Sequence, residues 1–174
     1  MKGSVELSSA RLRLRRLRPD DAGAICAYRG LPEVARYQSW ESFTMDDAAR
    51  LIASQREVVP NTPGSWLQLA LTLAESDQVV GDCGIRFPDG DERPVELGIT
   101  LSPAHRGRGL AAEAIESVLR YAFDALGKHR AWAVTDAQNE PRGCSAVSGS
   151  GRKHTSSSTR GSKIAGAVNT SSPS

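Results

Sequence analysis

A strand, a glycine-rich turn, a long amphipathic helix and a second strand follow one another between residues 95 and 135, and this order leaves few possible folds. The first strand is predicted over Val95–Leu101. Apolar residues recur at helical spacing from Leu110 onward, and Gly127 is placed to end that helix. Residues 131–135 predict the second strand. A strand–helix–strand unit implies that the two strands lie parallel in one sheet.

The chain before this unit predicts helices and antiparallel strands. Residues 11–18 begin with alternating apolar and basic side chains and end at Pro19, which predicts a strand at or near the sheet edge with one wet face. Helices are expected over residues 22–28, 32–37 and 45–58. The last of them begins with a near capping box of Thr44 and Asp47. Three successive antiparallel strands are expected over residues 66–73, 79–87 and 95–101. The fold class is therefore α+β, with a mixed, mostly antiparallel central sheet flanked by helices.

The composition changes sharply after Pro141. Residues 142–174 contain ten Ser, five Gly and five Lys or Arg, and no Asp, Glu, Phe, Trp or Tyr. Of the 22 basic and 20 acidic residues of the chain, 17 and 20 lie in residues 1–141, so that part carries −3 and the tail +5. So little apolar surface cannot offset an ordering entropy of roughly 1–2 kcal/mol per residue. We expect one domain over residues 1–141 and a basic tail without secondary structure over residues 142–174.

The sequence predicts a cytoplasmic protein with no membrane partner. No apolar run approaches the roughly 20 residues of a membrane span, and residues 1–9 lack the apolar stretch of a secretory signal. The three cysteines, at positions 26, 83 and 144, are odd in number and far apart, so they match neither a disulfide framework nor a zinc cluster. A monomer and a homodimer both remain open.

Residues 106–111, Arg-Gly-Arg-Gly-Leu-Ala, predict a phosphate-binding loop. The unpaired backbone N–H groups and the positive dipole end of the following helix favour an anion there. The alternative is a solvated loop whose glycines only allow a tight turn. A P-loop is excluded because no Lys follows Gly109. A dinucleotide-binding fold would use the G-x-G-x-x-A pattern that begins at Gly107, with Asp136 further on. Antiparallel strands precede that pattern, however, and too little foldable chain follows it.

The stretch from Glu96 to Ala114 closely resembles the acetyl-CoA-binding motif of the GNAT superfamily of N-acetyltransferases. Arg106-x-x-Gly109-x-Ala111 matches the [QR]-x-x-G-x-[GA] signature of that family. The resemblance covers about residues 8–141, and several shorter segments look like the branch that includes the ribosomal-protein N-terminal acetyltransferases. It implies a three-layer GNAT fold. It also implies transfer of an acetyl group from acetyl-CoA to a primary amine, on a protein N-terminus or a small molecule, by direct attack and without a metal.

The resemblance also implies which residues bind acetyl-CoA. Backbone N–H groups of the loop and the helix start would hold the pyrophosphate, and both arginine side chains would add charge. The strand before the loop would pair with the pantetheine arm where it splays from the following parallel strand, and a backbone amide there would polarise the thioester carbonyl. The implied cofactor-binding residues are Ile99, Thr100, Leu101, Arg106, Gly107, Arg108, Gly109, Leu110, Ala111 and Asn139.

Glu96 is the candidate catalytic base. Attack of an amine on a thioester requires a base, and members of the family often use a carboxylate on this strand. The alternative is that Glu96 is a surface or ion-paired strand residue. His105, beside the loop, is a second candidate base, although a histidine there more often contacts phosphate or is solvated. Cys83 is interpreted as a core residue, because direct transfer needs no acyl-enzyme.

Aromatic residues are the candidates for contacts with the acceptor. Trp40, Trp66 and Trp132 are placed to line a cleft, although a tryptophan in a central strand, such as Trp132, is more often part of the core. In the family the acceptor site is shaped between the first two helices, which corresponds here to residues 37–43. A ribosomal-protein N-terminus, an aminoglycoside-like amine and a small metabolite all remain open as acceptors.

The resemblance ends after Pro141. Members of the family continue with a Ser, a helix that ends in Leu-Gly-Phe, and two strands that usually include the acid on the thiol side. Back-translation of the tail in a shifted frame can produce the missing Leu-Gly-Phe turn, so we interpret the tail as frameshifted. We therefore expect the sheet to lack its last helix and strands, and the strand at Ala131 to be an exposed edge. Two alternatives are an impaired CoA-binding remnant and, less favoured, a basic tail that binds nucleic acid.

Overall fold

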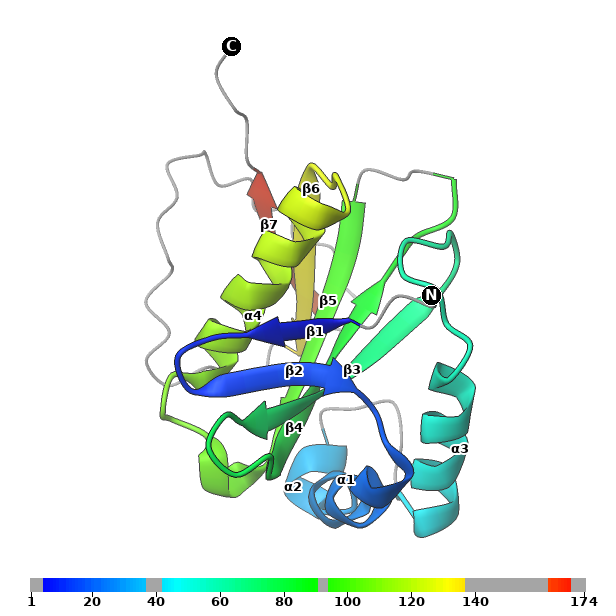
Figure 1. The fold of residues 1–174 in the computed structure, drawn as a ribbon, viewed down its shortest axis with the longest axis vertical. Helices are drawn as coiled ribbons and strands as arrows, with labels where there is room; N and C mark the ends of the chain where they lie inside the picture. The colour runs from blue at the N-terminus through cyan, green and yellow to red at the C-terminus, as the bar shows by residue number, and fades with distance from the viewer. Residues whose placement is uncertain (1–4, 37–41, 91–93, 137–162, 170–174) are drawn as a thin grey trace.

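The computed structural model describes residues 5–36, 42–90, 94–136 and 163–169, and within them seven strands form one mixed sheet in chain order (Figure 1). The strands are β1 (Glu6–Ser8), β2 (Leu12–Arg16), β3 (Trp66–Leu73), β4 (Val79–Arg86), β5 (Pro94–Leu101), β6 (Arg130–Asp136) and β7 (Lys163–Asn169). Neighbouring strands run antiparallel except for β5 and β6, which are parallel as the sequence predicted. The mixed, mostly antiparallel sheet is therefore confirmed.

The predicted helices are present. They are α1 (Ala22–Arg29), α2 (Pro32–Ala35), α3 (Met45–Gln55) and α4 (Leu110–Arg120), with helical turns over Pro19–Asp21, Pro103–His105 and Tyr121–Ala125. The capping box of α3 is confirmed, because Asp47 N donates to Thr44 Oγ1 at 3.2 Å and Thr44 N donates to Asp47 Oδ2 at 2.8 Å. The helix ends at Gln55 rather than at Val58. The Arg16 guanidinium binds the carbonyl oxygens of both residues, at 3.1 and 2.7 Å, and so satisfies backbone groups at that end.

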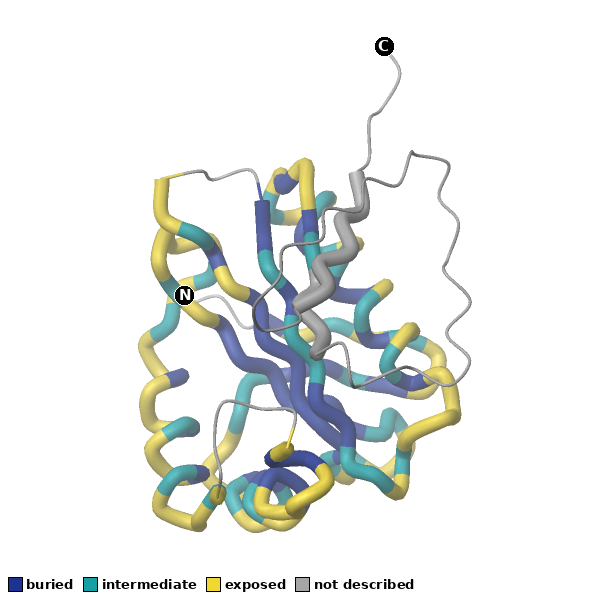
Figure 2. The backbone as a smooth tube through the Cα atoms, turned by 180° about the vertical axis from the view of Figure 1, so that it is seen from behind, coloured by how far each residue is buried: buried dark blue, intermediate teal, exposed yellow. Residues whose placement is uncertain are grey.

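The helices cover opposite faces of the sheet. Residues of α4 pack with alternate side chains of β2 to β5 in the main core, which includes Leu14, Leu69, Ile85, Leu97, Leu110 and Val118. On the other face α1 and α3 form a smaller core around Ile25 and Ile52. Figure 2 shows the buried residues following the central strands, with the exposed residues concentrated on the helices and turns. No helix in the described ranges has the length and apolarity needed to span a membrane.

The parallel strands β5 and β6 separate along their length. Their pairing begins at Pro94 and Arg130 and its last pair is Leu97 with Ala133. Strand β5 nevertheless continues to Leu101, and it stays paired with β4 up to that residue. The carboxyl-terminal half of β5 thus continues its pairing with β4 beyond the last pair with β6, and it leads directly into the glycine-rich loop.

Two features of the sheet differ from the expectations. Strand β7 pairs with β6 over the whole of β6, from Arg130 opposite Asn169 to Asp136 opposite Lys163. Residues 163–169, where no secondary structure was expected, thus form a strand next to β6, which was expected to be an exposed edge. The physical reason is that an edge strand presents unpaired N–H and C=O groups to any compatible segment. The β-branched residues of this segment, Ile164 and Val168, favour an extended backbone.

The basic face of β2 is the second difference. The sequence predicted that this face is wet, but Arg15 is only 5% exposed. Its guanidinium donates to both carboxylate oxygens of Asp21, at 2.8 and 3.0 Å, and to Asp77 Oδ1 at 3.1 Å. A charged side chain can be buried where opposite charges and hydrogen bonds satisfy it. Arg15 therefore ties β2 to the turn before α1 and to the β3–β4 turn.

Candidate functional site

The glycine-rich loop is built by a short helical turn and two glycines in the left-handed region. Ser102 N donates to Val80 O at 2.8 Å, which fixes the end of β5, and His105 N donates to Ser102 O at 2.9 Å. Gly107 and Gly109 then have φ angles of 74° and 76°. For a residue with a Cβ this conformation costs roughly 1–2 kcal/mol. The two glycines let the chain reverse and enter α4 within a few residues.

The loop presents a set of unpaired backbone donors. The N–H groups of Gly107 to Ala112 donate to no acceptor among the described residues, and the bond that begins α4 is from Glu113 N to Gly109 O, at 3.1 Å. The first N–H groups of any helix lack partners inside it, and they form the positive end of the helix dipole. This arrangement binds anions, phosphates in particular. The predicted loop residues are thus brought together in the geometry that such a site needs.

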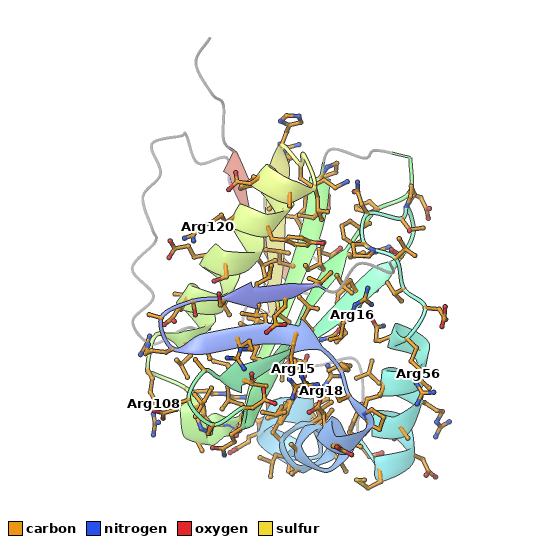
Figure 3. All side chains as sticks on the ribbon, viewed as in Figure 1. Arg15, Arg16, Arg18, Arg56, Arg108 and Arg120 are labelled. Atoms are coloured by element: carbon orange, nitrogen blue, oxygen red, sulfur yellow. The ribbon has the colours of Figure 1, made fainter. Side chains whose placement is uncertain are left out.

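Positive side chains flank these donors. Arg106 and Arg108 are both exposed, and Figure 3 shows Arg108 at the outer surface of the loop that leads into α4. Arg106 Nε also donates to Leu101 O at 3.3 Å, which connects the loop to the end of β5. The Nδ1 atom of His105 is buried and has no hydrogen-bond partner among the described residues.

A residue that the sequence did not suggest, Arg11, supports the loop from the β1–β2 turn. Its Nη1 donates to Arg108 O at 2.9 Å, and its Nε donates to Glu113 Oε2 at 2.7 Å. The other carboxylate oxygen of Glu113 accepts from Arg11 N at 2.8 Å and from Ser9 Oγ at 2.6 Å. These contacts join residues about a hundred positions apart, so no local pattern in the sequence could have identified them.

The predicted pantetheine residues lie where β5 has separated from β6. Ile99, Thr100 and Leu101 follow the last β5–β6 pair and are paired on their other side with β4. Ile99 and Leu101 belong to the α4-side core. Because side chains alternate along a strand, Thr100 points to the opposite face, which α1 covers. The backbone of this segment therefore lies beyond the point where β5 and β6 stop pairing, next to the glycine-rich loop.

Glu96 lies on the α1 side of β5, just before the last pair of β5 with β6. Its Oε2 atom is 3.3 Å from Arg86 Nη1, and its side chain is 19% exposed. Glu96 is also opposite Trp132 in β6. The ion pair is one of the two alternatives that the sequence left open for this residue. Arg86 is 54% exposed, so the pair lies at the surface and is weak.

The aromatic ring of Trp66 packs over β4 and over β5, the strand that contains Glu96. The ring lies over Gly84 and Gly98 of these strands; a Cβ on Gly84 would overlap the ring, and one on Gly98 would contact it at 3.7 Å. Trp66 Nε1 donates to Gln68 Oε1 at 2.6 Å, and the residue is still 38% exposed. The two glycines therefore make room for a partly exposed indole close to the point where β5 and β6 stop pairing.

Below Trp66 lies a buried polar network centred on Asp82. Arg29 donates to both oxygens of Asp82, at 2.6 and 3.0 Å, and Tyr28 Oη and Gln68 Nε2 donate to the same carboxylate. Burial raises the pKa of Tyr28 well above its usual value, and the charge of Asp82 raises it further. The phenol is thus a neutral hydrogen-bond donor. Asp82 is the cross-strand neighbour of Thr100, so this hydrogen-bonded network lies beside β5 on the α1 side of the sheet.

Other candidate residues lie on the α4 side of the sheet or outside the described ranges. Cys83 is fully buried in the α4-side core, and burial raises the pKa of its thiol to about 12. This agrees with its interpretation as a core residue. Asn139, Trp40 and most of residues 37–43 lie outside the described residues, so their predicted roles stay predictions.

Comparison with known proteins gives a consistent result. A family model described as an acetyltransferase (GNAT) domain matches residues 11–144. An uncharacterized N-acetyltransferase, p20 of Bacillus licheniformis, is 30% identical over 135 residues, which are 78% of this chain and 75% of that protein. The fold is similar to that of the ribosomal-protein-S5-alanine acetyltransferase from Vibrio fischeri, with a TM-score of 0.66, 17% identity, and coverage of 79% of this chain and 77% of that one. It is also similar to Mycobacterium smegmatis RimJ in complex with CoA-disulfide, with a TM-score of 0.64, 20% identity, and coverage of 79% and 69%.

Proposed function

The chain belongs to the GNAT acetyltransferase family, and from that premise we propose that it transfers an acetyl group from acetyl-CoA to a primary amine. The observation that carries the proposal is the continuous path from the point where β5 and β6 stop pairing to the unpaired N–H groups at the start of α4. An extended thioester with a pyrophosphate at its far end needs these two features side by side. The acyltransferase class is that of the family; the assignment of roles below is our proposal.

Acetyl-CoA would bind along the backbone. The amides of residues 107–112 would hold the pyrophosphate, and Arg106 and Arg108 would add charge to the same anion. The pantetheine arm would lie against Ile99, Thr100 and Leu101, which follow the last β5–β6 pair, Leu97 with Ala133. A backbone N–H of this segment would polarise the thioester carbonyl and stabilise the oxyanion that forms on it. Asn139 would add a side-chain contact to the cofactor or the amine.

Glu96 would act as the base, directly or through a water molecule. The neutral amine attacks the carbonyl carbon, the nitrogen loses a proton to Glu96, and the C–S bond breaks to release CoA as a thiolate that then takes up a proton. Glu96 shares the α1 side of β5 with Gly98 and Thr100, and the ring of Trp66 lies over Gly98.

The acceptor would approach Glu96 from the α1 side of the sheet, past the partly exposed Trp66. A primary amine on a peptide N-terminus or on a small molecule is the acceptor class that we propose. The first of these is supported by the name of the Vibrio fischeri neighbour, whose acceptor is a ribosomal protein. A panel of peptides with free N-terminal Ala or Ser, compared with N-blocked versions, would distinguish peptide acceptors from small amines.

Two measurements test the proposal. Acetyl-CoA should raise the thermal midpoint of the protein, because a ligand that binds only the folded state stabilises it by about 2.7 kcal/mol at 100 times its Kd. Glu96→Gln should keep this shift while lowering kcat with an amine acceptor by about 10²-fold or more, and Arg120→Met on the far side of α4 should change neither. No shift with millimolar acetyl-CoA would refute the assignment of the loop. A shift without turnover of any amine would refute the catalytic assignment and leave a CoA-binding protein.

A further inference from the structure

We infer that Arg11 is a positioning residue for acetyl-CoA, because it fixes the direction of the loop amides and offsets part of the charge of a carboxylate beside them. The inference rests on the proposed function of the loop and goes beyond it. Arg11 lies in the β1–β2 turn, outside the motif that binds the cofactor, and its guanidinium contacts both the loop and the first turn of α4.

The bond to the Arg108 carbonyl sets the orientation of one peptide group. A peptide group is planar and trans, so its C=O and N–H point in opposite directions. Because Arg11 Nη1 holds Arg108 O at 2.9 Å, the N–H of the same peptide group, which belongs to Gly109, must point away from Arg11. That N–H is one of the loop amides without an acceptor among the described residues. Arg11 therefore keeps the Gly109 N–H directed away from its own side chain and available to a ligand.

This support matters because the loop has few other fixed points. Gly107 and Gly109 have no Cβ to restrict their backbone, and a Cβ on Gly107 would meet nothing within 4 Å. Among the described residues, a side chain of the loop itself makes one hydrogen bond, from Arg106 Nε to Leu101 O at 3.3 Å. A flexible anion site must lose conformational entropy when the ligand binds, whereas a site that is already ordered loses less. Arg11 would thus supply order before the cofactor arrives.

The second effect of Arg11 is electrostatic. Glu113 lies in the first turn of α4, where its negative charge would repel a pyrophosphate bound at the same helix end. Partial burial acts to raise its pKa, but the hydrogen bonds from Ser9 and Arg11 and the charge of Arg11 outweigh this and hold the pKa below its usual value. Glu113 is therefore ionised, and the 2.7 Å ion pair with the half-exposed Arg11 offsets part of its charge. The negative charge of Glu113 then opposes less of the attraction between the phosphates and the positive charges of Arg106 and Arg108.

The test compares Arg11→Met with Arg13→Met in the full chain. Arg13 is the matched control, because it lies two residues away in β2 and forms a 3.5 Å ion pair with Glu6 that is 41% exposed on the arginine side. Binding of acetyl-CoA and of acetyl-pantetheine, which lacks the pyrophosphate, is measured by titration calorimetry. We expect Arg11→Met to raise the Kd for acetyl-CoA about tenfold or more. Its Kd for acetyl-pantetheine should stay within about twofold of the value for the unchanged protein. Arg13→Met should alter neither.

Two further variants separate positioning from charge and from folding. Arg11→Met with Glu113→Gln removes the uncompensated carboxylate and should recover part of the lost affinity. Arg11→Lys keeps a positive charge on a less disruptive side chain but cannot bind the Arg108 carbonyl and Glu113 together, so its Kd should lie between those of Arg11→Met and the unchanged protein.

The inference is overturned if Arg11→Met binds acetyl-CoA as tightly as Arg13→Met does. It is also overturned if Arg11→Met weakens both ligands equally, because Arg11 would then support the fold as a whole. If Arg11→Met does not fold, the Arg11→Lys comparison decides, and equal affinity to the unchanged protein counts against positioning. Failure of the unchanged protein to bind acetyl-CoA would instead refute the proposed function, and this inference with it.

Discussion

The buried ion pair between Arg29 and Asp82 should contribute far more to stability than an exposed pair of similar chemistry. The two side chains are 8% and 2% exposed and are joined by two hydrogen bonds, at 2.6 and 3.0 Å. We propose to remove each partner separately with Arg29→Met and Asp82→Asn, and then both together. Met keeps much of the length of the arginine side chain and so keeps some of its packing against the ring of Phe43.

The expected magnitude follows from burial. Opposite charges about 4 Å apart attract by about 4 kcal/mol at an effective dielectric constant of 20. Removal of one partner of a buried pair takes away the main counter-charge of the other, which costs about 3–5 kcal/mol. Removal of both leaves no unpaired charge, so the double variant should lose less than the sum of the single losses. We expect a coupling energy of about 2–3 kcal/mol between the two residues.

Equilibrium unfolding in urea, followed by tryptophan fluorescence and circular dichroism, measures the four free energies of the cycle. The matched control is the pair of Glu116 and Arg120 on α4, which is 3.3 Å apart with side chains 74% and 67% exposed. Figure 3 shows Arg120 directed away from the body of the molecule. Its coupling energy with Glu116 should be about 0.3–0.5 kcal/mol. Equal coupling in the two cycles, or a buried coupling below about 0.5 kcal/mol, would refute the argument that burial makes the Asp82 network structural.

Gly109→Ala forces a Cβ into the left-handed region at φ 76°; it should destabilise the protein by about 1–2 kcal/mol and weaken acetyl-CoA binding, as melting and calorimetry would reveal. Cys83, whose thiol pKa burial raises to about 12, should escape alkylation in the folded protein and react once urea unfolds it, which peptide mass spectrometry can follow. The hydrogen bond from Arg15 holds the pKa of Asp77 below its usual value, so the stability that it contributes is present above about pH 4 and is lost as the pH falls further. The acid side of a plot of thermal midpoint against pH should therefore be shallower in Asp77→Asn. Gly84→Val should displace the Trp66 indole and change its fluorescence spectrum without abolishing folding.

The parts of the fold that the sequence predicted correctly depend on local patterns. Helix α3 begins where the capping box of Thr44 and Asp47 places it, because both hydrogen bonds join residues three positions apart. The short strand β1 was not predicted, since three residues are too few to reveal a period. Arg15 illustrates a different limit. Its place in an alternating pattern predicted exposure, and only the fold brings Asp21 and Asp77 close enough to bury it.

The candidate site divides in the same way. The glycines of the loop could be identified because a left-handed turn before a helix places specific demands on residues close together in the chain. The Asp82 network could not be identified, because Arg29 and Asp82 are 53 residues apart. The position of the Trp66 ring could not be predicted either, because the ring lies over glycines of two other strands. A tryptophan beside a glycine-containing strand carries no signal until the register of the strands is known.

A backbone site therefore depends on distant side chains that its own motif does not contain. The amides proposed to bind the anion are those of residues 107–112, which the glycine-rich motif places at the start of a helix. Their directions, however, are set by peptide orientations, and in this structure one orientation is held by Arg11, 97 residues away from the carbonyl that it binds. The motif thus supplies the donors of the proposed site, and the packing of β1 and β2 against α4 helps to set their direction. Sequence comparison restricted to the loop would rank two proteins as equivalent even if only one of them had an arginine at the position of Arg11.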